Sequence, residues 1–147
     1  MPAEETSPPW ALPATLALEA AQAGHDLQAR AHLVQLVHRH GADVMPEVLT
    51  WLVDQVVARA GHQGTAQVHL VFRRRGRVVD ADEMSPEERW SGRLFAARAA
   101  GDEDQTLALL ATIVGGLDYG ATVGVLLTVL GELLRRLARG EQVLRRG

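Results

Sequence analysis

The fold is decided by a stretch of sequence that occurs twice. Residues 17–59 have the sequence ALEAAQAGHDLQARAHLVQLVHRHGADVMPEVLTWLVDQVVAR, and residues 94–136 have the sequence LFAARAAGDEDQTLALLATIVGGLDYGATVGVLLTVLGELLRR. The two segments align without gaps at an offset of 77 residues, with identical residues at ten of 43 positions. Many other positions exchange one apolar residue for another. We therefore predict two structurally related halves.

Each half is predicted to contain three helices, which are short, medium and long. The short helices end at Ala23-Gly24 and at Ala100-Gly101, where glycine suits the left-handed conformation that ends many helices. Asp26 and Asp102 follow at positions where a carboxylate caps the next helix. The two halves therefore carry the same signals for the end of one helix and the start of the next.

The long helices show the clearest apolar periodicity. The first is expected to begin after Asp43, with Pro46 in its first turn, and to end at Gly61. One side of each helix is apolar and is predicted to face the core. These residues are Met45, Val48, Leu49, Leu52, Val53, Val56 and Val57 in the first half and Val125, Leu126, Val129, Leu130, Leu133 and Leu137 in the second.

Residues 64–83 lie between the halves and contain a predicted β-hairpin. Residues 68–72 and 77–79 have strand-forming composition and flank a turn that contains Gly76. Such a hairpin is not stable alone. We therefore expect its apolar side chains, Leu70, Phe72 and Val79, to pack on the helices.

A capping box marks the start of the second half. Ser85 stands as N-cap, Pro86 occupies the first helical position, and Glu88 follows Ser85 by three residues. This is the sharpest local signal in the chain.

These elements predict an all-α fold of about six helices in two pseudo-repeated halves, with a small β-hairpin inserted between them. The domain is expected to span residues 13–139, with halves at 17–59 and 85–137. Residues 1–12 are predicted to be a flexible tail, because proline and acidic residues dominate them, with Trp10 as an exception that docks or stays exposed. Residues 140–147 are predicted to be a C-terminal tail.

Composition excludes several kinds of site. The chain has 147 residues, 15 basic and 18 acidic, and no cysteine, which excludes disulfides, thiolate nucleophiles and cysteine metal sites. Its start lacks the basic and apolar regions of a signal peptide. We expect a cytoplasmic protein.

One apolar stretch, residues 107–134, raises the question of a membrane span. Asp118 lies near its middle, where a charge costs about 2.5 to 3.5 kcal/mol on insertion scales. Gly115 to Asp118 has the sequence of one helix ending and the next being capped. We therefore expect no membrane segment.

The polar residues indicate no catalytic, cofactor or metal site. None of the six histidines is paired with another at the i, i+4 spacing of a helical metal site. Ser7, Ser85 and Ser91 are the only serines, and none lies in a nucleophile motif. The acidic clusters at residues 80–83 and 102–104 suit a polar connector and a helix start.

The second long helix presents small residues opposite its apolar side. Gly120, Gly124, Leu127 and Gly131 lie in a row, although glycine destabilises a helix by up to about 1 kcal/mol. Close approach of another backbone explains such a row. The approaching helix belongs either to a second copy, in a homodimer, or to the same chain, with this helix at the centre of the monomer. Trp51, which lies opposite its own helix's apolar side, is a further candidate for an interface.

The densest basic patch is Arg73, Arg74, Arg75 and Arg77. Phosphates of a nucleic acid or an acidic protein surface would fit it. The acidic balance of the chain and the lack of a helix-turn-helix motif make nucleic acid the weaker candidate, and solvated charge at a hairpin tip is the simpler interpretation.

Taken together, the sequence predicts a non-catalytic interaction or adaptor protein, homodimeric through the glycine-lined helix. The alternative is a protein that binds or responds to a small molecule, with an apolar pocket between the halves. The expected lining of that pocket is Leu52, Val56, Trp90, Phe95 and Tyr119. A nucleic-acid accessory factor that uses the arginine patch is the third hypothesis.

Overall fold

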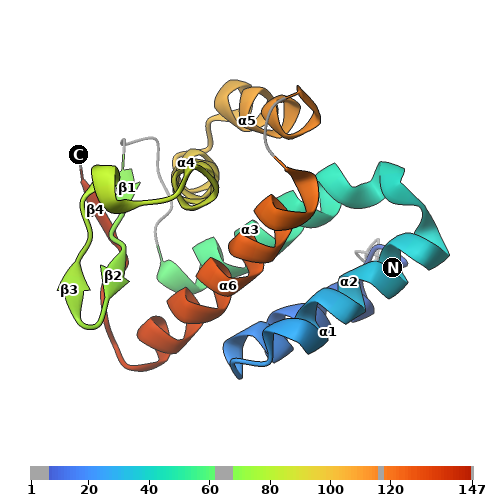
Figure 1. Cartoon of the computed structure of the whole chain (residues 1–147), viewed down its shortest axis with the longest axis horizontal. Helices are drawn as coiled ribbons and strands as arrows, with labels where there is room; N and C mark the ends of the chain where they lie inside the picture. The colour runs from blue at the N-terminus through green and yellow to red at the C-terminus, as the bar shows by residue number, and fades with distance from the viewer. Residues whose placement is uncertain (1–6, 62–67, 116–117, 147) are drawn as a thin grey trace, which may run out of the picture.

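The computed structural model describes residues 7–61, 68–115 and 118–146. Predictions for residues 1–6, for residues 62–67, for the helix boundary at residues 116–117 and for residue 147 lie outside this part. The described residues form six helices (Figure 1), which are α1 (Ala11–Gln22), α2 (Asp26–His40), α3 (Met45–Ala60), α4 (Pro86–Ala99), α5 (Glu103–Gly115) and α6 (Tyr119–Ala138). The predicted all-α class is confirmed.

The two halves share the boundary between their first and second helices and the chemistry of that turn. Gly24 and Gly101 adopt positive φ angles of 82° and 69°, so the chain reverses direction after α1 and after α4. The amide of the next residue donates to a carbonyl in the preceding helix, from His25 to Ala20 at 2.8 Å and from Asp102 to Ala97 at 2.9 Å. Each half therefore begins with a helical hairpin, α1/α2 or α4/α5.

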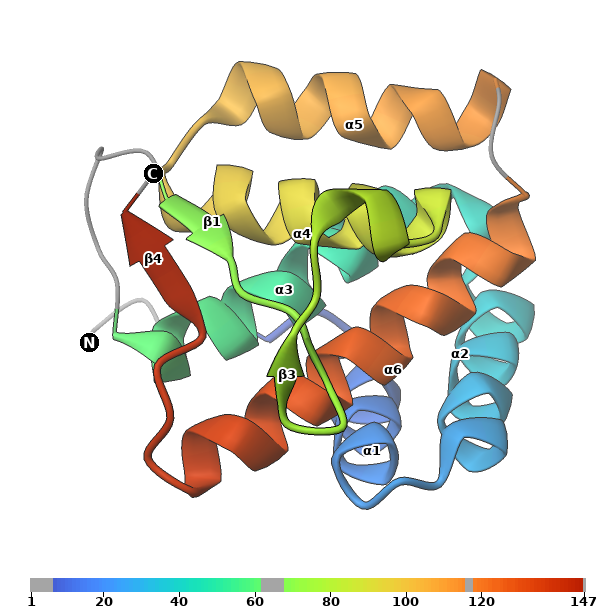
Figure 2. The ribbon, with the colours of Figure 1, turned by 60° about the vertical axis from the view of Figure 1, so that its left-hand side comes forward.

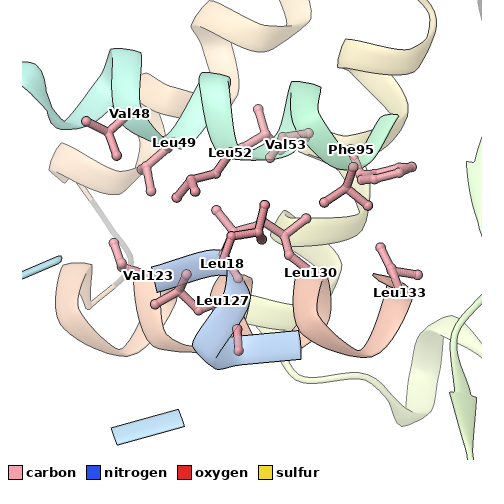
Figure 3. Close-up of a cluster of buried hydrophobic side chains, with 14 of the residues drawn as sticks. Leu18, Val48, Leu49, Leu52, Val53, Phe95, Val123, Leu127, Leu130 and Leu133 are labelled. Atoms are coloured by element: carbon pink, nitrogen blue, oxygen red, sulfur yellow. The ribbon is translucent and has the colours of Figure 1, made fainter. Parts of the chain in front are cut away.

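The core lies between the long helices. The apolar side of α3 faces α6, and side chains from both helices meet there with Leu18 of α1 and Phe95 of α4 (Figure 3). α6 crosses the molecule and contacts each of the other five helices. It is therefore the central helix of the monomer.

The segment between the halves contains the predicted hairpin, with a shorter first strand than expected, because residues 68–70 pair elsewhere. β2 (Arg73–Arg74) pairs with β3 (Arg77–Val78), while β1 (Val68–Leu70) pairs with the C-terminal strand β4 (Leu144–Arg146). Figure 2 shows β4 beside β1. Residues 144–146 are therefore part of the fold, which corrects the prediction of a C-terminal tail at 140–147.

A buried arginine connects the sheet of β1 and β4 to α6. Arg136 is only 2% exposed, and its Nη1 donates to the carbonyl oxygen of Val71 at 2.6 Å while its Nε donates to Glu141 at 3.2 Å. Hydrogen bonds from Arg139 and from Arg136 lower the pKa of the Glu141 carboxyl from its ordinary value. The buried charge is thus paired, and it holds the residue that follows β1 and the chain that leads to β4.

The predicted hairpin packing is confirmed. Leu70 and Val79 are buried, and the ring of Phe72 lies against α4 at Gly92, where an added Cβ would come within 2.8 Å of it. Glycine at position 92 therefore makes room for the hairpin.

Helix caps are as predicted at three of four positions. Ser85 and Glu88 form the capping box, with bonds of 3.1 and 2.9 Å. Asp102 and Asp118 accept from backbone amides of α5 and α6. Asp26 does not cap α2, because it is the first residue of that helix and His25 occupies the capping position.

The N-terminal boundary differs from the prediction. α1 begins at Ala11, and Trp10 is only 5% exposed, so residues 10–12 belong to the folded body. Trp10 packs edge-on against Trp51, with ring centroids 5.8 Å apart. Of the two possibilities for Trp10, the structure shows docking.

None of the helices among the described residues has both the length and the apolar character that a membrane crossing requires. The boundary predicted at Asp118 does separate α5 from α6.

Replacing Arg136 with alanine tests the connection between α6 and the sheet of β1 and β4. We expect the Arg136→Ala change to lower the free energy of unfolding by about 3 kcal/mol or more, because the carbonyl of Val71 and the carboxylate of Glu141 lose their partner. Urea unfolding measures the change. Arg139→Ala is the matched control, since exposed Arg139 also pairs with Glu141, and we expect it to lose less than about 1 kcal/mol. Equal losses for both variants would contradict this account.

Candidate interaction surfaces

A groove between α1 and α2 has a volume of about 760 Å³. Apolar side chains, three histidines and Arg39 form its walls, and none of the lining residues is acidic. The lining residues are Leu12, Pro13, Leu16, His32, Val34, Gln35, Leu36, His38, Arg39 and His40.

The apolar wall exists because α1 places its small residues inward. Ala14, Ala17 and Ala21 are at most 1% exposed, whereas Leu12 is 69% exposed and Leu16 is 38% exposed. A surface helix normally buries its large apolar residues. In α1, folding buries alanines together with Leu18 and leaves two other leucines, one turn apart, facing the groove.

Close packing explains why alanine lies inside. α6 approaches the backbone of α1 so closely that a Cβ at Gly131 would overlap the carbonyl group of Ala21. Leucine in place of the inward alanines would push the helices apart. This constraint accounts for the alanines, and it leaves the exposed leucines without a structural reason.

The polar wall comes from the last turns of α2. His38, Arg39 and His40 end this helix, where the positive charge of Arg39 offsets the partial negative charge of the unpaired carbonyl groups. His32 lines the same groove from within α2. The helix end therefore supplies N–H donors and one fixed positive charge, on Arg39, beside exposed leucines.

The glycine row predicted as a dimer interface is occupied within the chain. Gly124 and Gly131 are buried; the guanidinium of Arg30 lies over Gly124, and Ala21 lies against Gly131. Leu127 is 2% exposed, while Gly120 is exposed at the start of α6. Of the two explanations for this row, the structure shows the central helix. Homodimerisation remains a prediction, although the glycine row no longer supports it. The solution mass from light scattering tests it.

Trp51 also has an intramolecular partner. It is partly exposed and packs against Trp10, and it lines a shallow hollow that contains Asp54 and Arg98. Asp54 accepts two hydrogen bonds of 2.8 Å from Arg98, and Glu103 accepts another. The bonds to Asp54, above all, raise the pKa of Arg98 beyond its ordinary value.

The structure does not bring the five predicted pocket residues together around one cavity. Leu52, Val56, Trp90 and Phe95 are at most 3% exposed and belong to the core. The indole N–H of Trp90 donates to the carbonyl oxygen of Leu109 at 2.8 Å. Tyr119 alone of the five lines surface hollows, at the start of α6.

Glutamates balance part of the arginine patch. Arg74 and Arg77 form ion pairs of 3.2 and 2.9 Å with Glu88 and Glu83. Arg73 lies 3.8 Å from Glu141, which also pairs with Arg136 and Arg139, and Arg75 occupies the turn, with a φ of 55°. Part of the charge that suggested phosphate binding is therefore balanced inside the chain, and nucleic-acid binding stays the weaker prediction.

Among the described residues, no group of three or more histidine, aspartate or glutamate side chains is placed to hold a metal ion. Comparison of the chain with protein-family models, with curated proteins and with solved structures finds no match. The argument for function therefore depends on the surfaces themselves.

Sequence reasoning missed the groove, although a signal was present. Ala14, Ala17 and Ala21 follow the i, i+3, i+7 spacing of one helix face, and Leu12 and Leu16 lie off that face. A stripe of alanines beside displaced leucines indicates close helix packing together with an exposed apolar surface.

Two glycines of α6 test the occupied row. We expect Gly131→Ala to lower the free energy of unfolding by about 2 kcal/mol, because the new Cβ would overlap the α1 backbone. Gly120→Ala is the matched control. Its Cβ meets only Asp118, at 3.7 Å, and alanine is the better helix former by up to about 1 kcal/mol. Thermal unfolding measures both variants. Unchanged stability in Gly131→Ala would mean that α1 does not approach this face.

Proposed function

We propose that this protein is a non-catalytic interaction protein that binds an acidic amphipathic helical segment of a partner in the groove between α1 and α2. The proposal rests on one observation, which is the exposure of Leu12 and Leu16 while alanines fill the inner face of the same helix. The two exposed leucines need not weaken the fold, but a contiguous exposed apolar surface is characteristic of a binding site.

The shape of the groove favours a helix as its occupant. Two antiparallel helices form its walls, and an amphipathic helix commonly lays its apolar face into such a groove. The leucines of α1, one helical turn apart, match the spacing of apolar side chains on an incoming helix.

The charge of the groove favours acidic flanks on that helix. Arg39 supplies the fixed positive charge of its lining, and none of the lining residues is acidic; complementary charge steers association and selects partners. A basic helix would meet like charge in the same place. We retain the cytoplasm as the proposed setting, since the chain contains no cysteine and its fold needs no oxidising compartment.

Peptide binding tests the proposal. The probe is a labelled synthetic helix with leucines on one face and glutamates on the other, and its counterpart has lysine at each glutamate. Fluorescence anisotropy measures binding. We expect saturable binding of the glutamate peptide and at least about ten-fold weaker binding of the lysine peptide.

Leucine variants locate the contact. The double variant Leu12→Ser, Leu16→Ser is expected to bind the glutamate peptide at least about ten-fold more weakly, because the apolar wall is lost. Leu27→Ser is the matched control: Leu27 is 82% exposed on α2 but is not among the groove's lining residues. Equal binding by the double variant and the parent, or by the two peptides, would refute the proposal.

A further inference from the structure

A second hollow lies on the other side of α2, between α2 and α6, and has a volume of about 490 Å³. Its walls come from both halves of the chain, since α2 belongs to the first half and α6 to the second. Val34 and His38 line both this hollow and the α1/α2 groove. The other lining residues are Arg30, Leu33, Val37, Met45, Tyr119, Gly120, Val123 and Gly124.

The lining is chiefly apolar and has few polar groups. Leu33, Met45 and Val123 are at most 9% exposed and form its buried part. A hollow of this volume, lined mainly by aliphatic side chains with a few polar groups, has the features of a small-molecule site. Tyr119 contributes a hydroxyl that is protonated at neutral pH and able to donate, and burial raises its pKa further from the ordinary value.

Arg30 is the fixed cation of this hollow. Its guanidinium lies over Gly124, where any Cβ would overlap it, so glycine at this position makes room for the arginine. Among the residues that the structure describes, no carboxylate lies within ion-pair distance of Arg30. Arg98 near α3, by contrast, has two carboxylate partners.

The other half of the chain lacks this arrangement. At the offset of 77 residues, Leu107 stands in place of Arg30 and Glu47 in place of Gly124. The hollow that corresponds to this one, beside α3 and α5, includes Asp43 and no cationic residue in its lining. The arginine over a glycine is therefore not a general product of the repeated fold.

We propose that the hollow between α2 and α6 binds a small apolar monocarboxylate, with its hydrocarbon part against Leu33 and Val123 and its carboxylate toward Arg30. A guanidinium recognises a carboxylate through charge and paired N–H donors. The aliphatic lining holds the remainder of the ligand by excluding water. This site lies on the other side of α2 from the peptide groove, shares Val34 and His38 with its lining, and does not depend on its function.

Calorimetric titration with defined probes tests the inference. The probes are octanoate, decanoate and naphthoate, each below its aggregation concentration, and decanol is the neutral counterpart of decanoate. We expect saturable, equimolar binding of at least one carboxylate to the full chain. Decanol is expected to bind at least about ten-fold more weakly, since it lacks the charge that Arg30 recognises.

Two arginines of α2 provide the decisive comparison. Arg30→Gln is expected to weaken carboxylate binding at least about ten-fold. Arg39→Gln is the matched control, because Arg39 is an exposed cation of the same helix that lines the peptide groove and not this hollow, and we expect unchanged carboxylate affinity. Both variants are surface changes, so thermal unfolding should show that each remains folded.

A filling variant tests the position without changing charge. Gly120 lines the hollow, and an added Cβ there would meet no atom closely enough to clash. Gly120→Leu should therefore fold, narrow the hollow and weaken the binding of decanoate. The inference is overturned if no probe carboxylate binds saturably, if decanol binds as tightly as decanoate, or if Arg30→Gln binds as tightly as the parent. Because the peptide experiment uses other residues, failure of either proposal leaves the other standing.

Discussion

The contact between α6 and α1 at Gly131 and Ala21 is the constraint on which the rest of the structure depends. Here two helices meet with a backbone carbonyl of one against the Cα of the other. Such an approach requires small residues on both sides, because any larger side chain would separate the helices. It fixes α1 on the central helix, and the reversal at Gly24 then fixes α2 beside both of them.

The surface of the molecule follows from this contact. Since α1 must present alanines inward, its leucines Leu12 and Leu16 face outward and form one wall of the groove. Since α2 is held beside α6, the side chain of Arg30 extends across Gly124 and forms the edge of the second hollow. α2 is thus the wall that both hollows share, through Val34 and His38.

The fold repeats one helix contact with different side chains. At the offset of 77 residues, Asp54 of α3 and Arg98 of α4 take the places of Gly131 of α6 and Ala21 of α1, and they are joined by two hydrogen bonds of 2.8 Å. An ion pair needs more room between helices than a glycine beside an alanine does. The two halves therefore share their helix order and turns while the equivalent contacts between them differ, and the hollow with the cationic edge occurs between α2 and α6 and not between α5 and α3.

The sequence by itself determined the helices, their order and several of their ends, because apolar periodicity, capping by Ser85 and glycine turns act over a few residues. It also showed that the glycines of α6 require a close neighbour. Only the tertiary structure decided which neighbour that is, since the approach of α1 joins residues more than a hundred positions apart. The pairing of β1 with β4 and the burial of Arg136 were also decided only by the tertiary structure. The hollow at Arg30 likewise arises between α2 and α6, which are distant in sequence, so local patterns do not indicate it. The groove lies between consecutive helices, and the alanine stripe of α1 carried a local signal for it.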